Sequence, residues 1–383
     1  MSAVNRVPAP SPGQLAEGRK VMRPKVDVLV VGLGPAGACA ARTAATSGAS
    51  VLAVERRSAV GVPVQCAEFV PLPMGKHALA SEVFQQRIDA MTTILPSGER
   101  VVSDFPGIMI DRAKFDQTLA RAARAAGSEK SLETVVDGID GARSIAVVRR
   151  NGDAREIHYR VLIAADGPLS RVGASLGLPS LETVDSRQYT VLLLRRYAHT
   201  DVFLSADYPG GYAWLFPKGN VANLGLGMDT RLAPDLKTPL DALHLQLAGR
   251  GLVGMDVVRR TGGLIPVGGL RERLVVGNVL FAGDSAGLTH PITGAGIAAA
   301  VTSGEAAGSN AARFLAGEAG ALADYEEDIR DQFETTLARA VARRRAMTRF
   351  WTGPEARADA MHRRGWIAFP EYFDESPEVG LAG

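Results

Sequence analysis

A glycine-rich turn between an apolar run and an alanine-rich run constrains the fold of this chain more than any other feature. The apolar run Val26–Val31 is typical of a buried parallel strand, and the motif GLGPAG follows it directly at residues 32–37. An alanine-rich helical run and a second strand, Ser50–Val54, then lead to Glu55. Strand, glycine turn, helix and strand in this order predict a βαβ unit that binds a dinucleotide.

The glycines of this turn each meet a separate steric need. Gly32 permits the tight turn, Gly34 lets the backbone approach a pyrophosphate, and Gly37 lets the helix pack close to the strand. The helix N-terminus offers free N–H groups to the phosphates, and Glu55 would accept hydrogen bonds from ribose hydroxyls. A glycine-rich turn without a ligand is the alternative. The residues expected to hold the dinucleotide are Gly32, Gly34, Pro35, Ala36, Gly37, Glu55 and Arg56.

Length, charge and cysteine content narrow the class of protein. With 383 residues the chain can form one large or two modest domains, and its formal net charge of +2 gives no sign of a nucleic-acid partner. Its two cysteines, Cys39 and Cys66, cannot form a disulfide framework, which fits a reducing cytoplasm. We expect Cys39, in the helical run, to be a small core residue, and we expect no metal site.

The two ends of the chain differ from its middle. Residues 1–24 are rich in Pro, Ala and basic residues without a continuous apolar core, so we expect a disordered tail and not a secretory signal. No apolar run reaches about eighteen residues, so no membrane-spanning helix is expected. Residues 322–352 are strongly helical, and their basic half would present a solvated face or contact anionic lipid headgroups. Its arginines are Arg339, Arg343, Arg344, Arg345 and Arg349.

Changes of pattern predict an α/β fold with a Rossmann-like dinucleotide domain in two pieces, 25–180 and 265–320. Between 181 and 264, short strand-like runs alternate with Gly and Pro turns, which predicts an inserted antiparallel-sheet domain for the substrate. Residues 321–383 are predicted to form a helical C-terminal region. Within the dinucleotide domain, helices are predicted over Arg112–Ala126, with Asp111 as the N-cap, and over Gly294–Phe314.

Two further motifs follow predicted strands, AADG at residues 164–167 and GDSAG at residues 283–287. In this order, GLGPAG, AADG and GDSAG resemble the motifs of FAD-binding flavoproteins built like aromatic hydroxylases. The resemblance implies that Asp166 and Gly167 lie near the flavin diphosphate and the nicotinamide path, and that Gly283 and Asp284 contact the ribityl chain. It also implies that Arg112, in a DRxxFD context, lies near the FAD.

Two stretches are similar to the geranylgeranyl reductases within that group. The stretch YAWLFPKG at residues 212–219, followed by GLG at 225–227, resembles their YxWxFP…GxG signature. The stretch PVQCAE at residues 63–68 resembles their cysteine-containing loop, and GDSAGLTHPITGAGI at 283–297 resembles their flavin loop and helix. This resemblance implies FAD contacts at Pro291, Gly294, Ala295, Gly296 and Ile297.

This chain departs from the reductase pattern at two positions. Ala295 stands where a Glu is common, and His290 stands where Asn or a small residue is common. Both positions are expected beside the flavin ring, so the resemblance does not identify the exact redox partner or substrate. We expect His290 to contact the substrate; a local hydrogen bond at the entry to the helix is the alternative.

Tyr212, Trp214 and Phe216 alternate along a predicted strand and therefore share one face. They would form an apolar wall for a long hydrocarbon or a flat ring, and ordinary sheet core is the alternative. Cys66 and Tyr212 are the candidate proton donors, with a bound water as their rival. Cys66 could also be simply buried, and Lys218 could be a solvated turn residue.

The resemblance implies an FAD-dependent oxidoreductase that reduces carbon–carbon double bonds of a geranylgeranyl-type polyprenyl chain. A hydride from reduced flavin would reach one alkene carbon and a proton the other, so an acid must be held near the flavin. No second GxGxxG is present, so NAD(P)H or a reduced carrier protein would act as a transient donor. A flavin-dependent monooxygenase for an aromatic substrate, including one on a partner protein, is the alternative. An electron-transfer flavoprotein is a third class.

Overall fold

The computed structural model describes residues 25–374. The tail expected at 1–24 and the last residues of the C-terminal region, 375–383, lie outside the described residues. Within the described part, a mixed eight-stranded sheet, the first sheet, has the strand order β17-β18-β11-β1-β2-β8, and β10 joins β9 to β11. The strands are β1 (Lys25–Val31), β2 (Val51–Val54), β8 (Glu129–Ser131), β9 (Thr134–Asp140), β10 (Ile145–Arg150), β11 (Asp153–Ala164), β17 (Val275–Val276) and β18 (Val279–Phe281).

The central strands of the first sheet run parallel. Strand β1 pairs with β2 on one side and with the second half of β11 on the other, and β18 extends the parallel run beyond β11. The first half of β11 pairs antiparallel with β10. The carboxyl ends of β1, β11 and β18 therefore meet at one edge, which is where α/β proteins bind dinucleotides.

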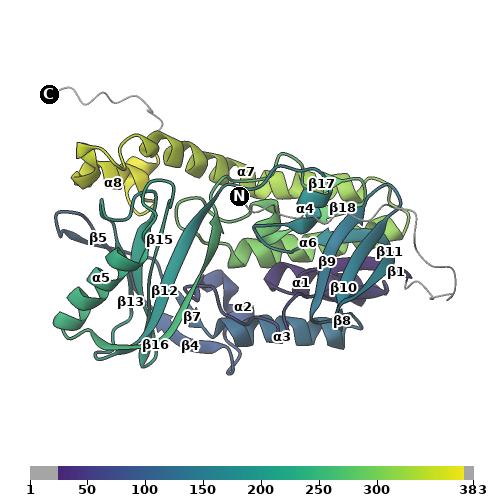
Figure 1. Ribbon diagram of the computed structural model, residues 1–383, viewed down its shortest axis with the longest axis horizontal. Coiled ribbons are helices and arrows are strands. Elements are labelled where there is room, and N and C mark those ends of the chain that lie inside the picture. The colour runs from purple at the N-terminus through teal and green to yellow at the C-terminus, as the bar shows by residue number, and fades with distance from the viewer. Residues whose placement is uncertain (1–24, 375–383) are drawn as a thin grey trace, which may run out of the picture.

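Helices pack against the first sheet (Figure 1). Helix α1 (Pro35–Thr46) packs against α3 (Arg112–Ala125) and α6 (Ile297–Leu315). The α1–α6 contact depends on two glycines, because an added Cβ at Gly304 or Gly308 would clash with the backbone of Ala36 or Ala40. The short helix α4 (Arg171–Ser175) follows the AADG motif.

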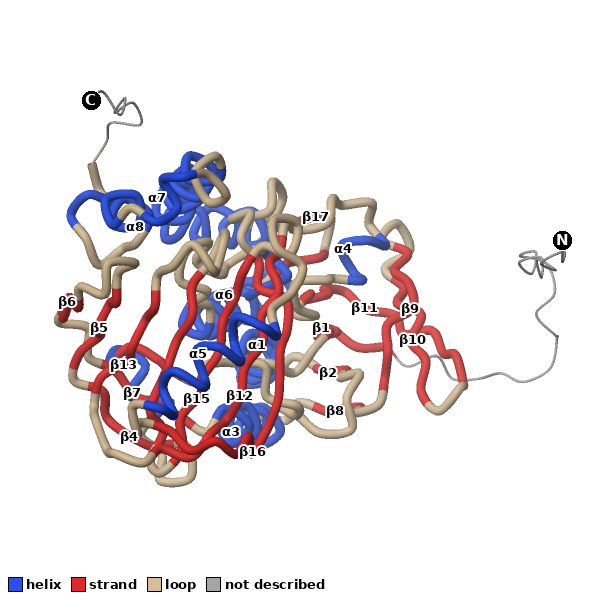
Figure 2. The backbone as a smooth tube through the Cα atoms, turned by 60° about the vertical axis from the view of Figure 1, so that its left-hand side comes forward, coloured by secondary structure: helices blue, strands red, loops and turns tan. Residues whose placement is uncertain are grey.

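The second sheet, seven-stranded within the described residues, has the order β16-β12-β15-β14-β13-β5-β6 and is antiparallel except between β13 and β5. Helix α5 (Lys237–Gly249) lies across one of its faces, as Figure 2 shows, with Leu240, Leu243 and Leu247 buried against it. The strands are β5 (Ala90–Ile94), β6 (Arg100–Ser103), β12 (Thr183–Leu193), β13 (His199–Phe203), β14 (Tyr212–Lys218), β15 (Val221–Met228) and β16 (Val253–Pro266).

Two of these strands come from outside the range expected for the inserted domain. Strands β5 and β6 belong to residues 90–103 and extend the second sheet beyond β13. The neighbouring segments of the chain form a small third sheet. Its strands, in spatial order, are β3 (Phe69–Pro71), β7 (Gly107–Ile110) and β4 (Phe84–Ile88). Two short helices, η1 (Leu72–Met74) and α2 (Gly75–Ala78), follow β3. The segment 69–110 therefore contributes two strands to the second sheet as well as forming the small sheet.

The C-terminal region connects the two sheets. Helix α7 (Ala321–Thr348) runs from the first sheet toward the second and is followed by η3 (Pro354–Arg357), α8 (Asp359–Gly365) and η4 (Pro370–Tyr372) (Figure 1). Trp366 and Phe369 pack in one hydrophobic cluster with Trp214 and Phe216 of β14. The C-terminal segment thus completes the core of the second sheet.

The basic half of α7 is only partly a solvated face. Arg339, Arg345 and Arg349 are exposed, whereas Arg344 is buried and donates to the carbonyl oxygen of Gly210 at 2.6 Å. Among residues 25–374, no helix combines the length and the apolar character needed to cross a bilayer.

The predicted helices are present in the structure, with boundaries that differ by one to four residues. Helix α3 has the expected Asp111 cap, whose carboxylate accepts a hydrogen bond from the backbone N–H of Lys114 at 2.9 Å. Helix α6 begins at Ile297 and not at the predicted Gly294. The reason is a turn: Gly294 has a φ of +69°, and its N–H bonds back to the carbonyl oxygen of His290.

Candidate active site

The GLGPAG motif forms the turn between β1 and α1, and its glycines lie in different surroundings. Gly32 has a φ of +96°, and an added Cβ there would clash with the backbone of Ala165. An added Cβ at Gly37 would clash with the backbone of Gly32. At Gly34, by contrast, an added Cβ would meet no protein atom within 4 Å. Gly34 thus borders space at the N-terminus of α1, where a pyrophosphate can approach the backbone.

Glu55 closes this unit and holds the turn. Its carboxylate accepts hydrogen bonds from the backbone N–H groups of Leu33 at 2.9 Å and Arg57 at 3.0 Å. Each carboxylate oxygen can accept a further hydrogen bond, which is compatible with a contact to ribose hydroxyls. That contact stays a prediction. Arg56 is exposed, whereas Arg57 donates to Pro63 and Gln65 in the cysteine-containing loop.

The second and third motifs meet the first at the same edge of the sheet. Gly167 has a φ of +85°, and the Asp166 carboxylate accepts from the backbone N–H of Val172 at 3.1 Å. The other oxygen of Asp166 is buried and accepts no hydrogen bond, and burial raises the pKa of this carboxyl. An unpartnered buried acceptor suits contact with a ligand donor.

The GDSAG motif lies against the start of α1. It forms η2 (Gly283–Ala286), and an added Cβ at Gly283, with its φ of +63°, would lie 2.9 Å from the Cβ of Ala36. Asp284 accepts a hydrogen bond from the Thr289 hydroxyl at 2.6 Å. Three motifs far apart in sequence therefore form one cradle of glycine backbone, a helix N-terminus and carboxylates, and these residues fit FAD.

The loop before α6 is shaped by His290. Its backbone N–H donates to Ala295, and its ring Nδ1 accepts from the N–H groups of Ile292 and Thr293, both at 3.3 Å. Burial lowers the pKa of His290 to about 4, so the ring is neutral near neutral pH. The ring thus makes local hydrogen bonds at the entry to the helix, which was the alternative to a contact with substrate. The contact with substrate stays a prediction. Pro291 is buried, Gly294 and Ala295 are exposed, and Gly296 and Ile297 are half-buried.

The three aromatic residues of β14 differ in their surroundings. Trp214 and Phe216 are 5% and 9% exposed and lie in a hydrophobic cluster with Trp366 and Phe369. Tyr212 is half-buried and lines a small cavity together with Ile292 and Trp366. Its hydroxyl donates to the carbonyl oxygen of Thr293 at 2.5 Å. Of the three, Tyr212 therefore touches the loop that the resemblance assigns to the flavin.

Cys66 lies in the loop that leads from the first sheet to the small sheet. Its sulfur accepts a hydrogen bond from the backbone N–H of Glu68 at 3.2 Å, and its carbonyl oxygen accepts one from the Gln188 side chain. Gln188 also accepts from the indole N–H of Trp214 at 3.0 Å. The loop is thereby tied to the second sheet.

Cys66 and Tyr212 are both weak acids in this site. Burial raises the pKa of the Cys66 thiol, which the Arg112 charge partly opposes. Burial also raises the pKa of Tyr212, and negative charge on Cys66 raises it further, so the two groups interact. Arg112 itself donates to the Asp116 carboxylate at 2.7 Å. Both candidate donors are therefore protonated near neutral pH.

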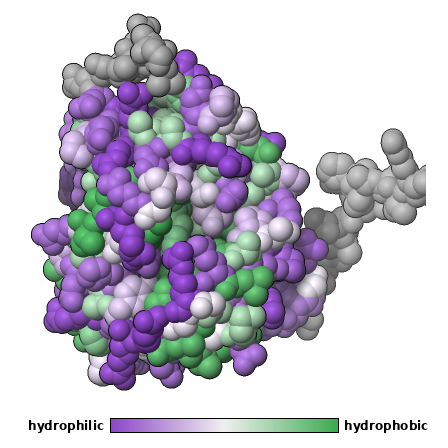
Figure 3. Space-filling model, turned by 90° about the vertical axis from the view of Figure 1, so that its left-hand side faces the viewer, coloured by the Kyte–Doolittle hydropathy of each residue, from purple (hydrophilic) through white to green (hydrophobic). Residues whose placement is uncertain are grey.

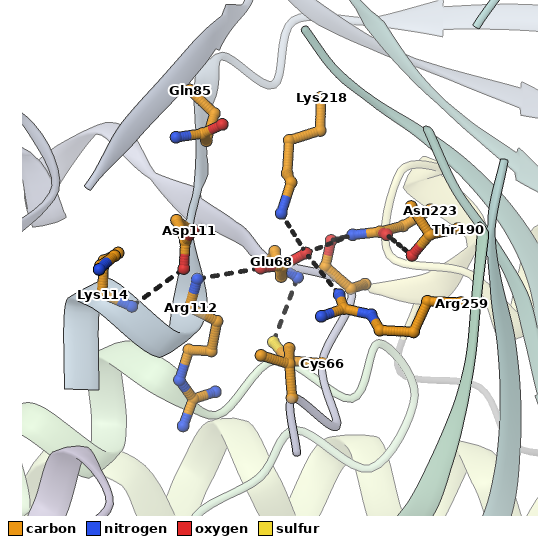
Figure 4. Close-up of polar contacts among 12 residues, drawn as sticks. Cys66, Glu68, Gln85, Asp111, Arg112, Lys114, Thr190, Lys218, Asn223 and Arg259 are labelled. Carbon is orange, nitrogen blue, oxygen red and sulfur yellow. Dashed lines mark hydrogen bonds and ion pairs between the residues drawn. The ribbon is translucent and has the colours of Figure 1, made fainter. Parts of the chain in front are cut away.

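A buried carboxylate beside Cys66 was not predicted from the sequence. Glu68 is 1% exposed and pairs with Lys218 at 2.7 Å, as Figure 4 shows. Lys218 is thus a half-buried ion-pair partner and not the solvated turn residue considered above. The two residues are 150 positions apart, and neither has a local sequence signal that indicates the other.

The remaining cysteine agrees with its predicted role. Cys39 is buried in α1, and burial raises the pKa of its thiol to about 12. In the described part of the chain, no group of three or more His, Cys, Asp or Glu side chains is placed to hold a metal ion.

Comparisons with known proteins show which family and fold this chain shares. The family model described as FAD dependent oxidoreductase matches residues 27–167, and the one described as Lycopene cyclase protein matches residues 226–361. A geranylgeranyl bacteriochlorophyll reductase-like protein from Thermoplasma acidophilum has a solved structure with a TM-score of 0.79 to this one and 26% identity. The match covers 88% of this chain and 95% of that chain.

Two curated relatives match over most of the chain. Digeranylgeranylglycerophospholipid reductase of Methanocella arvoryzae is 33% identical over 344 residues, which cover 82% of this chain and 86% of that protein. Digeranylgeranylglycerophospholipid reductase 1 of Methanopyrus kandleri is 37% identical over 346 residues, which cover 82% and 89%. The resemblance inferred from the sequence motifs is confirmed. This chain belongs to the digeranylgeranylglycerophospholipid reductase family of FAD-dependent oxidoreductases.

Proposed function

We propose that this protein reduces isolated carbon–carbon double bonds in the polyprenyl chains of a glycerophospholipid. The observation that carries the proposal is the contact between Tyr212, on the aromatic strand, and Thr293, in the loop before α6. A half-buried residue of the aromatic strand thereby links the loop expected beside the flavin to a small, mostly apolar cavity. The names of the curated relatives support this substrate class.

When bound, FAD would supply the hydride for the double bond. The residues expected to hold it are those of the three motifs, with Gly34 bordering the pyrophosphate and Asp284 the ribityl chain. The N-terminus of α6 adds a positive dipole end on the same side of the cradle.

The protein supplies the proton. An isolated alkene is a poor hydride acceptor, so an acid must stay protonated and lie close to it. Cys66 and Tyr212 meet the first condition, because burial raises the pKa of each. We assign Cys66 as the proton donor and Tyr212 as the residue that orders the loop, with a water on either group as the competing donor.

The cavity beside Tyr212 would take a segment of the hydrocarbon chain. Its walls are mostly apolar or aromatic, including Leu204, Ile292 and Trp366. Such walls exclude water and bind chains without fixed polar contacts. His290 would border the substrate from the flavin side.

NAD(P)H or a reduced electron carrier would act as the transient donor, because the sequence has no second GxGxxG. We also propose a cytoplasmic protein that makes peripheral contact with the membrane holding its lipid substrate. Figure 3 shows apolar side chains among polar ones at the end of the molecule with the second sheet. Leu192, Leu245, Met255 and Val258, from β12, α5 and β16, are exposed, as are basic residues of α7.

The experiment is anaerobic reduction of a defined lipid. The FAD-loaded protein, reduced with dithionite, is mixed with digeranylgeranylglycerophospholipid in detergent, and the product is analysed by mass spectrometry. We expect a mass gain of one hydrogen molecule per reduced double bond, and no product from a Gly34→Val variant without FAD. Unchanged lipid together with hydroxylation of aromatic compounds in air would instead support the monooxygenase, which the named relatives do not favour.

A further inference from the structure

The backbone of Glu68 has an unusual conformation directly beside Cys66. Its φ is +69°, in the left-handed region that residues other than glycine rarely adopt. In this conformation its N–H donates to the Cys66 sulfur at 3.2 Å. The conformation of Glu68 therefore determines which hydrogen bond the thiol receives.

The carboxylate of Glu68 accepts hydrogen bonds from three separate elements and faces a cation from a fourth (Figure 4). One oxygen accepts from the backbone N–H of Arg112 at the start of α3, at 2.9 Å. The other accepts from the Lys218 ammonium at the end of β14, at 2.7 Å, and from the Asn223 amide of β15, at 2.8 Å. Arg259 of β16 lies 3.9 Å from the same oxygen.

These contacts make Glu68 the meeting point of both halves of the site. Asn223 is fully buried, also donates to the carbonyl oxygen of Ala67, and accepts from Thr190. A carboxylate buried to this degree is stable only while its partners remain in place. The arrangement therefore fixes the turn at residues 66–68 with respect to α3 and the second sheet.

We propose that Glu68 is a positioning residue for Cys66: its carboxylate, held by Lys218 and Asn223, fixes the turn that presents the protonated thiol to the reacting double bond. This inference rests on the proposed function in one respect, namely that the Cys66 proton is transferred to the double bond. The effect of Glu68 on the thiol itself is measurable without substrate.

The charged groups around Cys66 predict the sign of this effect. Negative charge on Glu68 raises the thiol pKa, whereas the Arg112 charge and the Glu68 N–H lower it. Asp116 is paired with Arg112, and Lys218 and Arg259 counter the charge of Glu68. Tyr212 is the other titratable group that interacts with Cys66.

The test measures the alkylation of Cys66 by iodoacetamide against pH in the FAD-loaded protein. A Cys39→Ala background leaves Cys66 as the one thiol of the chain. We expect Glu68→Gln, which keeps the side-chain shape, to lower the midpoint of the alkylation profile. We expect Lys218→Met to raise it, because the more distant Arg259 alone then counters the Glu68 charge. A shift of one pH unit changes the thiolate fraction about tenfold below the midpoint.

Two further variants complete the test. The Glu68→Gln/Lys218→Met variant removes both charges, so it should fold even if either single variant does not, and its midpoint should lie between those of the two. Glu326→Gln, in the ion pair with Arg330 on α7, is the matched control and should leave the midpoint unchanged. Reduced thermal stability with unmoved midpoints would show a purely structural ion pair and overturn the inference.

Turnover separates this inference from the proposed function. If Cys66 gives the proton, the rate of lipid reduction falls at high pH with a midpoint that moves in the same direction as the alkylation midpoint in each variant. Shifted midpoints without any lipid reduction would support the positioning of the thiol and reject the proposed function. Lipid reduction with unmoved midpoints would reject the role of Glu68 alone.

Discussion

The Tyr212 hydroxyl donates a 2.5 Å hydrogen bond to the carbonyl oxygen of Thr293, which lies 81 residues further along the chain. This bond joins the aromatic strand β14 to the loop between the GDSAG motif and α6. Since the loop carries His290 and the glycines expected beside the flavin, Tyr212 links the second sheet to the loop predicted to border the flavin.

Replacement of Tyr212 by Phe should lower turnover with little effect on the fold. The ring and its packing against Trp214 and Trp366 remain, while one hydrogen bond worth about 0.5–1.5 kcal/mol is lost. If the hydroxyl also gives the proton, kcat should fall about 100-fold or more. Tyr189→Phe, which removes a hydroxyl hydrogen-bonded to Asp241 in α5, is the control. Unchanged kcat in Tyr212→Phe would remove this hydroxyl from the reaction.

The variant Gly34→Val should fold but fail to bind FAD. An added Cβ at Gly34 meets no protein atom within 4 Å, so the larger side chain would occupy the approach to the pyrophosphate instead. The measurement is the ratio of flavin absorbance to protein. Gly138→Val is the control, because an added Cβ at this position in β9 also meets no atom within 4 Å. A fully yellow Gly34→Val protein would contradict the assigned site.

Replacement of Trp214 by Ala should mainly destabilise the protein. From the sequence, Trp214 is expected to belong to the apolar wall for the substrate, so its loss would alter the kinetics and cost the fold less than the loss of a core residue. The structure buries it among Phe216, Trp366 and Phe369, so the expected loss is roughly 3–5 kcal/mol in the free energy of unfolding. Thermal melting with parallel kinetics measures this, and Trp214→Phe should recover part of the stability. Unchanged melting with a raised KM would place the indole at the substrate.

The pH dependence of turnover should report the raised pKa of Cys66. A proton donor works only in its protonated form, and burial keeps the thiol protonated to higher pH than an exposed cysteine. Turnover should therefore persist through neutral pH and fall as pH rises through the raised pKa. In Cys66→Ser this alkaline limb should disappear while turnover becomes slower. An identical alkaline limb in that variant would assign it to another group, with Tyr212 as the next candidate.

Local signals were sufficient to predict the FAD cradle. The strand 26–31, the glycine turn and the strand ending at Val54 agree with β1, α1 and β2, because each depends on neighbouring residues: apolar runs, glycines at a tight turn and a helix start. The same holds for α3, whose Asp111 cap lies within its own first turn. The order of the three motifs resembles that of FAD-binding flavoproteins, and the stretches at residues 63–68 and 212–219 resemble the geranylgeranyl reductases among them.

Long-range contacts decided what local signals could not. Strands β5 and β6 pair with the second sheet, although their residues lie within the segment assigned to the dinucleotide domain. Trp214 alternates with Tyr212 and Phe216, but alternation specifies only a shared face. Packing of the C-terminal Trp366 and Phe369 decides that this face is core at Trp214 and borders a cavity at Tyr212.

The sequence by itself determined the first βαβ unit, since apolar runs and a glycine turn have a fixed local geometry, and its resemblance to known motifs pointed to the reductase family. Only the tertiary structure decided the environment of the thiol. Lys218 has the sequence context of a solvated turn residue, and Glu68 that of an ordinary loop residue. Burial of either charge alone would be unfavourable, so their roles depend on the 2.7 Å contact that folding makes between residues 150 positions apart.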